Sequence, residues 1–370
     1  MITIDALNIF YREDVISDFF KSCFEDSAPF LHQFLNCADI SLPVGSKFTI
    51  TNRLGLGKSI GTPDMIVVAE NSQESHIIIV ENKLGAAEGI TQTQRYESSE
   101  ARELIRNSLN LRDTLHFHFI YLTLDTTVAP SSTNFKNVYY EQFLTEGWAL
   151  NDATLNMLFT DFKEKLNQFY TPLSQPLQTL FSEKILDSTQ KKICWQSILF
   201  EKFNDSPQYE LDWGEVGGSG RNNFLFLVTK PNWKATTSFK DTGLANTFYV
   251  HIDTYINLLT SKNDVINEIG IRFETYPYVP HKNINNVEGY TNFIANKAIF
   301  SERLFHRIFP LIEGVKRKNN KSLVITIPVN NENLTFSIND YKHKISIIEN
   351  EIDFILNELK EEGILQKGVI

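Results

Sequence analysis

Short apolar runs rich in β-branched residues stand out in the first third of the chain. Met65–Ala69 and Ile77–Val80 are two such runs, and the polar segment Glu70–Ser75 separates them. Apolar runs of this length are typical of buried strands, and a short polar link is typical of a hairpin turn. The pattern therefore predicts two adjacent strands in the interior of a sheet.

The second of these strands ends in charged residues. Side chains alternate across a strand, so Glu81 and Lys83 are expected to point to one side of the sheet and Asn82 to the other. Asp64 lies at the mouth of the neighbouring strand. Buried charges are costly unless they pair or bind a metal. This strand end is therefore the first candidate for chemistry.

Helical and strand patterns surround the predicted hairpin. Residues 11–36 have apolar positions at helical spacing, and Pro29 predicts a break into two helices. Glu13 lies near the start of the first helix, where an acid is also favourable because it complements the helix dipole. Gln92 and Tyr96 are four residues apart and share one face of a further helix. The elements expected after the hairpin are a helix at 91–108, a strand at 117–124, a short strand and turn at 138–144, and a helix at 154–169.

Two histidines lie on one face of the strand predicted at 117–124. His116 and His118 flank Phe117 and point to the same side. Two histidines in this arrangement could bind a metal. The sequence offers no third ligand beside them, so ordinary strand positions are the preferred interpretation.

A linker is expected at Thr171–Pro176, which combines two prolines with polar residues. It separates a first domain, residues 1–170, from a second α+β domain, residues 177–370, with a possible role in recognising a target or partner. The second domain contains one dense basic cluster, for which a solvated loop and a phosphate contact both remain open. The cluster consists of Lys316, Arg317, Lys318 and Lys321. The elements expected in this domain are a helix at 177–203, strands at 224–229, 247–255 and 268–276, a helix at 290–309, a hairpin of strands at 322–329 and 333–338, and a helix at 345–361.

The composition is that of a globular, acidic chain. Its 370 residues are enough for two domains, and 42% of them are hydrophobic and 22% charged. The formal net charge of −10 argues against a generally basic nucleic-acid binder, but a local basic groove stays compatible with it. Residues 1–150 hold 11 Lys and Arg against 19 Asp and Glu, so most of the acidic excess lies in the half with the candidate site.

The cysteines and the hydropathy pattern indicate a cytoplasmic protein without a membrane span. Cys23, Cys37 and Cys194 show no paired pattern, which suits a reducing compartment. The first ten residues lack the pattern of a signal peptide, and no run reaches the roughly 18 apolar residues of a membrane span.

The charges at the strand end suit phosphodiester hydrolysis. This reaction needs a nucleophilic water and a means of spreading charge on the phosphate. Carboxylates such as those of Asp64 and Glu81 can hold Mg²⁺, which keeps several waters and accepts phosphate oxygens as ligands. A lysine such as Lys83 can orient the water and neutralise developing negative charge.

These residues resemble the signature of the PD-(D/E)XK nuclease superfamily. Pro63-Asp64 matches its first half, and Glu81-Asn82-Lys83 matches its second half. The residues Gln92-Thr93-Gln94-Arg95-Tyr96 look like the Gln-x-x-x-Tyr motif of an exonuclease-like branch with bacterial members, and Glu13 resembles the upstream acid of the family. The resemblance covers about residues 12–148.

The resemblance implies a fold and a set of roles. The fold is α/β and restriction-endonuclease-like, with a mixed central sheet flanked by helices in the order α-β-β-β-α-β. Asp64, Glu81 and the carbonyl of Asn82 would bind Mg²⁺, for which Mn²⁺ could substitute. Lys83 would position or activate the water. Glu13 would complete the acidic shell. Gln92 and Tyr96 would orient the site or contact nucleic acid.

Two functions of different class follow as hypotheses. The first is a metal-dependent nuclease acting on DNA, with a role in anti-phage defence or restriction that rests on the resemblance alone. The second is a non-catalytic module that keeps the nuclease fold and binds nucleic acid or protein. The complete set of Asp64, Glu81 and Lys83 favours the nuclease. A second copy of the chain or a partner protein is compatible with both.

Overall fold

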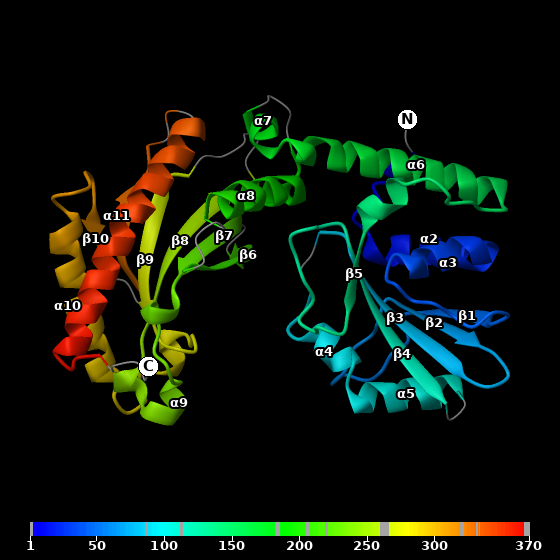
Figure 1. The fold of residues 1–370 in the computed structure, drawn as a ribbon, viewed down its shortest axis with the longest axis horizontal. Helices are drawn as coiled ribbons and strands as arrows, with labels where there is room; N and C mark the ends of the chain where they lie inside the picture. Colours follow the sequence, from blue (N-terminus) through cyan, green and yellow to red (C-terminus); the bar gives the residue numbers. More distant parts are fainter. Residues whose placement is uncertain are drawn as a thin grey trace. The chain divides into compact units, whose positions relative to one another are not determined.

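The computed structural model describes two compact units, Met1–Gln175 and Pro176–Ile370 (Figure 1). The described residues are 3–85, 88–111, 114–181, 186–203, 208–218, 221–259, 266–318, 322–330, 332 and 334–365. Among these residues, each unit contains one sheet with helices, so the α/β class expected from the sequence is confirmed. The N-terminal sheet is mixed and the C-terminal sheet is antiparallel.

The N-terminal unit is built on a sheet in which strand order follows chain order. Its described strands are β1 (Lys47–Asn52), β2 (Met65–Glu70), β3 (Ser75–Lys83), β4 (Leu115–Thr123) and β5 (Lys136–Tyr139). β1, β2 and β3 pair antiparallel, whereas β3, β4 and β5 pair parallel. The predicted hairpin is confirmed, because Met65 pairs with Val80 and Glu70 with Ser75. β1 was absent from the sequence-based prediction.

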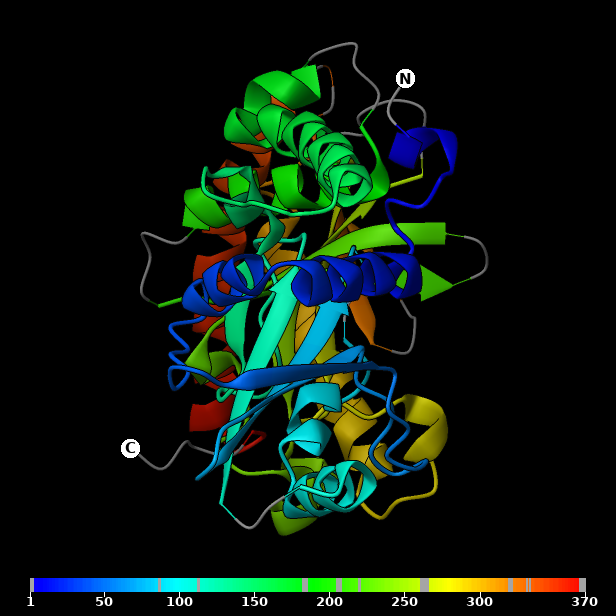
Figure 2. The same ribbon diagram turned by 90° about the vertical axis from the view of Figure 1, so that its right-hand side faces the viewer.

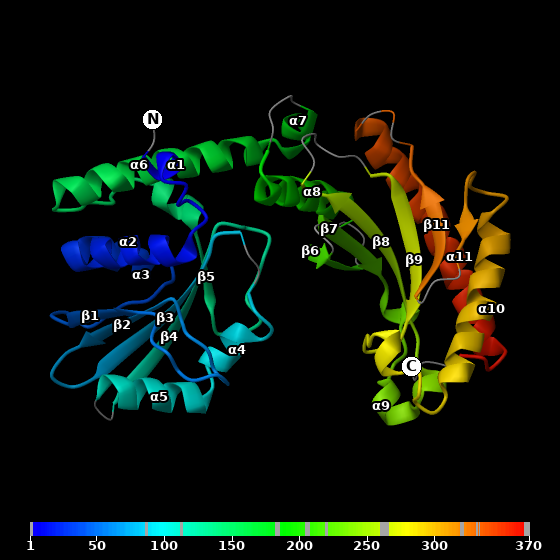
Figure 3. The ribbon, with the colours of Figure 1, turned by 180° about the vertical axis from the view of Figure 1, so that it is seen from behind.

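β3 is the central strand and is buried along its whole length. On one side Ile77 and Ile79 pack in an apolar cluster with Ile105 of α5 (Ser99–Leu109). Helices α2 (Glu13–Asp26) and α3 (Ala28–Asn36) cover the other side, with α6 (Ala153–Tyr170) beyond them (Figure 3). Helices on both faces explain why this strand is a continuous apolar run.

The helices of this unit begin and end where short-range signals allow. Ser27 caps α3 by accepting a hydrogen bond from the Phe30 backbone N–H, and Pro29 occupies the first turn, as the predicted break requires. The single helix predicted at 91–108 was wrong. It is divided into α4 (Gln92–Tyr96) and α5, because the Ser98 side chain accepts from the Ala101 backbone N–H and starts a new helix there.

The start of α2 lies at the end of the central strands. Figure 2 shows α2 and α3 (blue) crossing the direction of β3 and β4 (cyan and teal), whose arrowheads point toward this helix pair. A backbone contact agrees with the picture, since the Leu84 N–H, directly after β3, donates to the Glu13 carboxylate at 3.0 Å. The geometry brings the first turn of α2 to the charged end of β3.

The C-terminal unit is an antiparallel sheet with helices. Its strand order among the described residues is β10-β11-β9-β8-β7-β6. The strands are β6 (Glu210–Gly218), β7 (Arg221–Thr229), β8 (Tyr249–Asn257), β9 (Glu268–Glu274), β10 (Lys316–Arg317) and β11 (Leu323–Pro328), and the helices of four residues or more are α7 (Pro176–Phe181), α8 (Ser188–Phe203), α9 (Phe239–Thr242), α10 (Tyr290–Ile308) and α11 (Leu334–Glu361). The N-terminal unit also contains the short helix α1 (Thr3–Ala6).

The strand predicted at 333–338 was wrong from Leu334 onward, because α11 begins there. Its first turn is fixed by tertiary contacts, since the buried Ser337 hydroxyl bonds both the N–H and the carbonyl of Ile266. Ile338, Tyr341 and Ile345 then continue one buried stripe at helical spacing. Asn333 itself lies outside the described residues.

Two strands of this unit escaped the sequence-based prediction. β6 has few apolar residues and lies at the edge of the sheet, paired only with β7 among the described strands. β10 contains Lys316 and Arg317 of the basic cluster, and both are exposed. Lys318 is described and half-buried, whereas Lys321 lies outside the described residues, as do residues 182–185 of the helix predicted at 177–203.

Candidate active site

The end of β3 brings a carboxylate and an ammonium group together in the N-terminal unit. Glu81 is 1% exposed, and Lys83 is also buried. The Lys83 Nζ lies 2.6 Å from Glu81 Oε1 and 3.5 Å from Glu13 Oε2. Strand alternation places Glu81 and Lys83 on one side, and the antiparallel pairing with β2 places Asp64 beside them.

Asp64 directly precedes β2, where the backbone of β3 holds its side chain. The Asn82 N–H donates to Asp64 Oδ2 at 2.8 Å. Burial raises the pKa of Asp64, and the hydrogen bond and the Lys83 charge oppose this change. The carboxylate is therefore fixed at the same strand end as Glu81.

Glu13 is the first residue of α2, and its side chain reaches the site. One carboxylate oxygen accepts from the Leu84 N–H, and the other faces the Lys83 ammonium. An acid at a helix start needs no such contacts to be favourable. The structure therefore gives Glu13 a link to β3 in addition to its place in the first turn.

The polar side chain of Asn82 has its own partners on the opposite face of β3. Its Nδ2 donates to Ser17 Oγ at 3.0 Å, and its Oδ1 accepts from the Tyr140 hydroxyl at 2.7 Å. The side chain of Asn82 is engaged there, whereas its backbone N–H contacts Asp64. Ser17 and Tyr140 were not identified from the sequence. Ser17 lies one turn after Glu13 on α2, so helical spacing could have indicated it.

Gln92 connects α4 to the carboxylate of Glu81. Its Nε2 donates to Glu81 Oε1 at 2.8 Å and to the Tyr96 hydroxyl at 2.9 Å, and its Oε1 accepts from the Gly89 N–H at 2.9 Å. Gln92 is thereby held from both ends of its amide. The Tyr96 ring is buried, which favours an orienting role for Tyr96 over direct contact with a large ligand.

The electrostatics of the site disfavour the charge on Glu81. Burial, followed by the nearby charge of Asp64, raises the pKa of Glu81 to about 8, although Lys83 opposes this. Burial alone would lower the pKa of Lys83, but the carboxylates of Glu81 and Glu13 outweigh it and raise that pKa. Lys83 therefore stays positively charged. Its single charge does not offset the burial of Glu81 and its repulsion by Asp64.

One oxygen of Glu81 is left over by these contacts. Oε1 accepts from Lys83 and Gln92, whereas the buried Oε2 has no hydrogen-bond partner among the residues that the structure describes. Buried carboxylate oxygens are rarely unsatisfied in this way. A hard divalent cation bound between Asp64 and Glu81 would satisfy it and offset the repulsion of the two acids. The residues therefore fit Mg²⁺.

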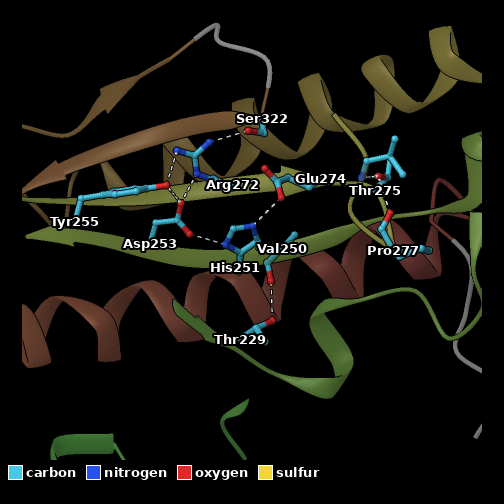
Figure 4. A network of polar contacts seen from close by, with 11 residues as sticks. Thr229, Val250, His251, Asp253, Tyr255, Arg272, Glu274, Thr275, Pro277 and Ser322 are labelled. Carbon is cyan, nitrogen blue, oxygen red and sulfur yellow. Dashed lines mark hydrogen bonds and ion pairs between the residues drawn. The ribbon is translucent and has the colours of Figure 1, made fainter. Parts of the chain in front are cut away.

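A second polar network, in the C-terminal unit, was not found from the sequence (Figure 4). The buried His251 lies between two carboxylates, with Nδ1 at 2.6 Å from Asp253 and Nε2 at 3.1 Å from Glu274. Arg272 bonds the other oxygen of Asp253 and reaches Ser322. The alternation of His251, Asp253 and Tyr255 along β8 was the available signal, since polar residues on every second position mark one face.

No family model, curated protein or solved structure matches this chain.

The three cysteines are unpaired, with Cys23 and Cys194 buried. Among the helices that the structure describes, none combines the length and the apolar character needed to cross a membrane.

Proposed function

We propose that the N-terminal unit is a metal-dependent nuclease that hydrolyses phosphodiester bonds in DNA. The observation that carries the proposal is the meeting of Asp64, Glu81 and Lys83 at one strand end, with Glu81 Oε2 unsatisfied in the described part of the chain. A buried acid with a pKa raised to about 8 is a feature that functional sites favour.

The element order of the unit supports the same proposal. Helices α2 and α3 precede the three antiparallel strands β1 to β3, then α4 and α5 lead to β4, which runs parallel to β3. This is the α-β-β-β-α-β order implied by the resemblance to PD-(D/E)XK nucleases. A restriction-endonuclease-like fold is accordingly part of the proposal.

The roles of the residues follow from their contacts. Mg²⁺ held by Asp64, Glu81 and the Asn82 carbonyl would supply positive charge for the phosphate and acidify a water. Lys83 holds its proton, so its ammonium orients an incoming oxygen and neutralises negative charge that develops on the phosphate. Gln92 fixes the Glu81 carboxylate, and Glu13 fixes Lys83.

The test is a cleavage assay on single- and double-stranded DNA and RNA, with Mg²⁺, Mn²⁺ or EDTA. We expect cleavage of DNA with either metal, none with EDTA, and none for Glu81→Gln. Glu97→Gln is a matched control from the neighbouring segment, because Glu97 makes its contacts with Ser132 and Asn134 instead of with the candidate site. Metal-dependent cleavage of RNA but not of DNA would show that the substrate is RNA. Tight binding of nucleic acid without cleavage in the presence of any of these metals would favour the non-catalytic module.

A further inference from the structure

A cluster of histidines lies at the other end of β3 from Glu81 and Lys83. His76 is the second residue of β3 and pairs directly with His116 of β4, and His118 follows two residues later. The imidazole centroid of His76 is 4.8 Å from that of His116 and 5.3 Å from that of His118. The parallel pairing of β3 with β4 thus supplies a third histidine, His76, that the sequence did not place beside His116 and His118.

Glu74 closes this cluster from the hairpin turn. Its Oε1 lies 3.3 Å from His76 Nε2, and its Oε2 lies 2.9 Å from His116 Nε2. The ligand atoms of Glu74, His76 and His116 all lie within 4.8 Å of one another. Ligands about 2.0 to 2.1 Å from a tetrahedral zinc ion lie about 3.3 Å from one another, and the separations of 3.3 Å and 2.9 Å between Glu74 and the two histidines are close to this value.

The Nε2 atom of His76 lacks a hydrogen-bond partner among the described residues. His76 is 9% exposed, and its Nε2 is a buried atom without a hydrogen-bond partner in the described part of the chain. The nearby carboxylate is therefore close but not directed as a hydrogen bond. A metal ion between them would satisfy the nitrogen lone pair and the carboxylate together.

His118 orients His76 for this role. His76 Nδ1 and His118 Nε2 are 3.0 Å apart, so one of them donates to the other. With the proton on His76 Nδ1, the Nε2 lone pair faces Glu74. Histidine ligands of metals are commonly held by such a second hydrogen bond.

The turn before β3 fixes the backbone of Glu74. The Asn71 side chain accepts from the backbone N–H groups of Gln73 and Glu74, and the Asn71 N–H donates to the Glu74 carbonyl. The third ligand is thus placed on a defined turn. The His116 side chain is 47% exposed, so the cluster is open to solvent on one side.

We propose that Glu74, His76 and His116 bind a zinc ion, with His118 as the positioning residue for His76. A set of two imidazoles and one carboxylate favours binding of zinc over binding of Mg²⁺. A water on the exposed side would be the fourth ligand of a tetrahedral zinc ion. The ion ties the β2–β3 turn to β4. This site is separate from the candidate active site, because the two occupy opposite ends of β3.

Calorimetric titration of the untagged, metal-stripped full chain with Zn²⁺ tests the site. We expect one tight equivalent in the wild-type protein, and the same equivalent in Asp64→Asn, which alters only the other end of β3. His76→Ala and Glu74→Gln should each weaken binding about 100-fold or more, because each removes one of three ligands. His118→Phe should weaken it roughly 10- to 100-fold, because it removes only the orienting acceptor.

Two further readouts make the result specific. Co²⁺ in place of Zn²⁺ should give the visible absorption bands of a tetrahedral ion, and His76→Ala should lose them. Zn²⁺ at about 100 times its Kd should raise the melting temperature of the wild-type protein by roughly 5 °C or more. His32→Ala is the matched control, since His32 is an exposed histidine of the same unit on α3.

The proposal is overturned if the wild-type protein takes up no zinc below about 10 µM, a range in which three-ligand sites bind. Equal affinity in wild-type, His76→Ala and Glu74→Gln proteins also overturns it. If His76→Ala fails to fold, His116→Ala replaces it, because the His116 side chain is half-exposed and its loss costs little packing. None of these measurements uses cleavage, so the result is independent of the nuclease proposal.

Discussion

The carboxylate of Glu81 is the residue on which the candidate active site depends. It is buried beside a second acid, and Lys83 and Gln92 hold one of its oxygens. Removing one member of a buried charged pair typically costs about 3 to 5 kcal/mol, because the other charge is left behind. Substitutions at this scale therefore change stability and chemistry together, and both have to be measured.

Lys83→Met should abolish cleavage, with a loss of about 1,000-fold or more, because the ammonium that faces Glu81 is removed. Methionine keeps the length of the buried side chain, and Glu81 can take up a proton in response, so we expect a folded protein of lower stability. Single-turnover cleavage and thermal unfolding measure the two effects. Lys58→Met, at an exposed loop position, is the control. Wild-type turnover in Lys83→Met would contradict the assigned role.

Asp64→Asn should stabilise the metal-free protein while weakening Mg²⁺ binding. The charge of Asp64 helps to raise the pKa of Glu81, so removing it relieves repulsion by about 1 kcal/mol, or roughly 2 to 4 °C in melting temperature. The amide can still accept from the Asn82 N–H. Melting curves in EDTA and calorimetry with Mg²⁺ measure these effects, with the exposed Asp39→Asn as the control. Unchanged Mg²⁺ affinity would argue against shared ligation by Asp64.

At the scale of elements, long-range contacts decide where α11 begins. The Ser337 hydroxyl both donates to and accepts from the backbone of Ile266, a buried residue that precedes β9. The first turn of the helix therefore lies where Ser337 can bond the backbone N–H and carbonyl of Ile266. This contact outweighs the local preference of the apolar and β-branched residues around Phe336 for a strand.

Ser337→Ala should destabilise the C-terminal unit by about 2 kcal/mol, because two buried backbone groups of Ile266 lose their partner. Thr335→Ala, two residues earlier at an exposed position, should change stability by less than about 0.5 kcal/mol. Denaturant unfolding of both variants gives the comparison. Equal effects of the two substitutions would show that the Ser337 contact contributes nothing specific.

The strands β8 and β9 are joined by charges that titrate. Burial alone would lower the pKa of His251, but hydrogen bonds to Asp253 and Glu274 outweigh it and raise the pKa to about 9. The unfolded value is about 6.5. This stabilisation is therefore complete below about pH 6.5 and is lost as the pH rises through about 9, with a total of at most about 3 kcal/mol.

Unfolding free energies measured from pH 6 to 10 should accordingly fall for the wild-type protein over this window. His251→Gln keeps a polar side chain without an ionisable group, and its curve should be flatter. Arg272 also contacts Asp253, but it keeps its charge throughout this range. Parallel curves for the two proteins would show that His251 does not carry the pH dependence.

At the scale of the whole molecule, charge is divided unequally along the chain. Residues 1–150 account for −8 of the net −10, so long-range electrostatics disfavour the approach of a polyanion to this part of the chain. The basic cluster of the C-terminal unit has exposed Lys316 and Arg317 on β10. We expect this unit to contribute the attraction for nucleic acid.

The triple variant Lys316→Ser, Arg317→Ser and Lys318→Ser should weaken DNA binding and lower the salt slope of log K by up to about 3, because fewer counterions are released. Cleavage at saturating DNA should change little. The matched control replaces three scattered exposed lysines of the same unit, Lys240, Lys282 and Lys342. If both triple variants lose the same affinity, net charge and not the cluster attracts the substrate.

The sequence by itself determined the central hairpin, the helix break near Pro29 and the presence of charged residues at the end of β3. Each follows from a period of two or 3.6 residues, or from a turn residue, and such signals act over a few positions. These local signals were also enough to predict that Asp64, Glu81 and Lys83 lie together at one strand end. Alternation along β3 and a short hairpin leave little freedom.

Only the tertiary structure decided which distant groups join these local patterns. The contact of Glu13 with Leu84, the bonds of Asn82 to Ser17 and Tyr140, and the bond of Ser337 to Ile266 all join residues that are far apart in the sequence. The histidine cluster shows the same limit, since His76 and His116 meet through the register of two parallel strands. Such register is set by the packing of the whole unit on both faces of the sheet, and no local pattern encodes it.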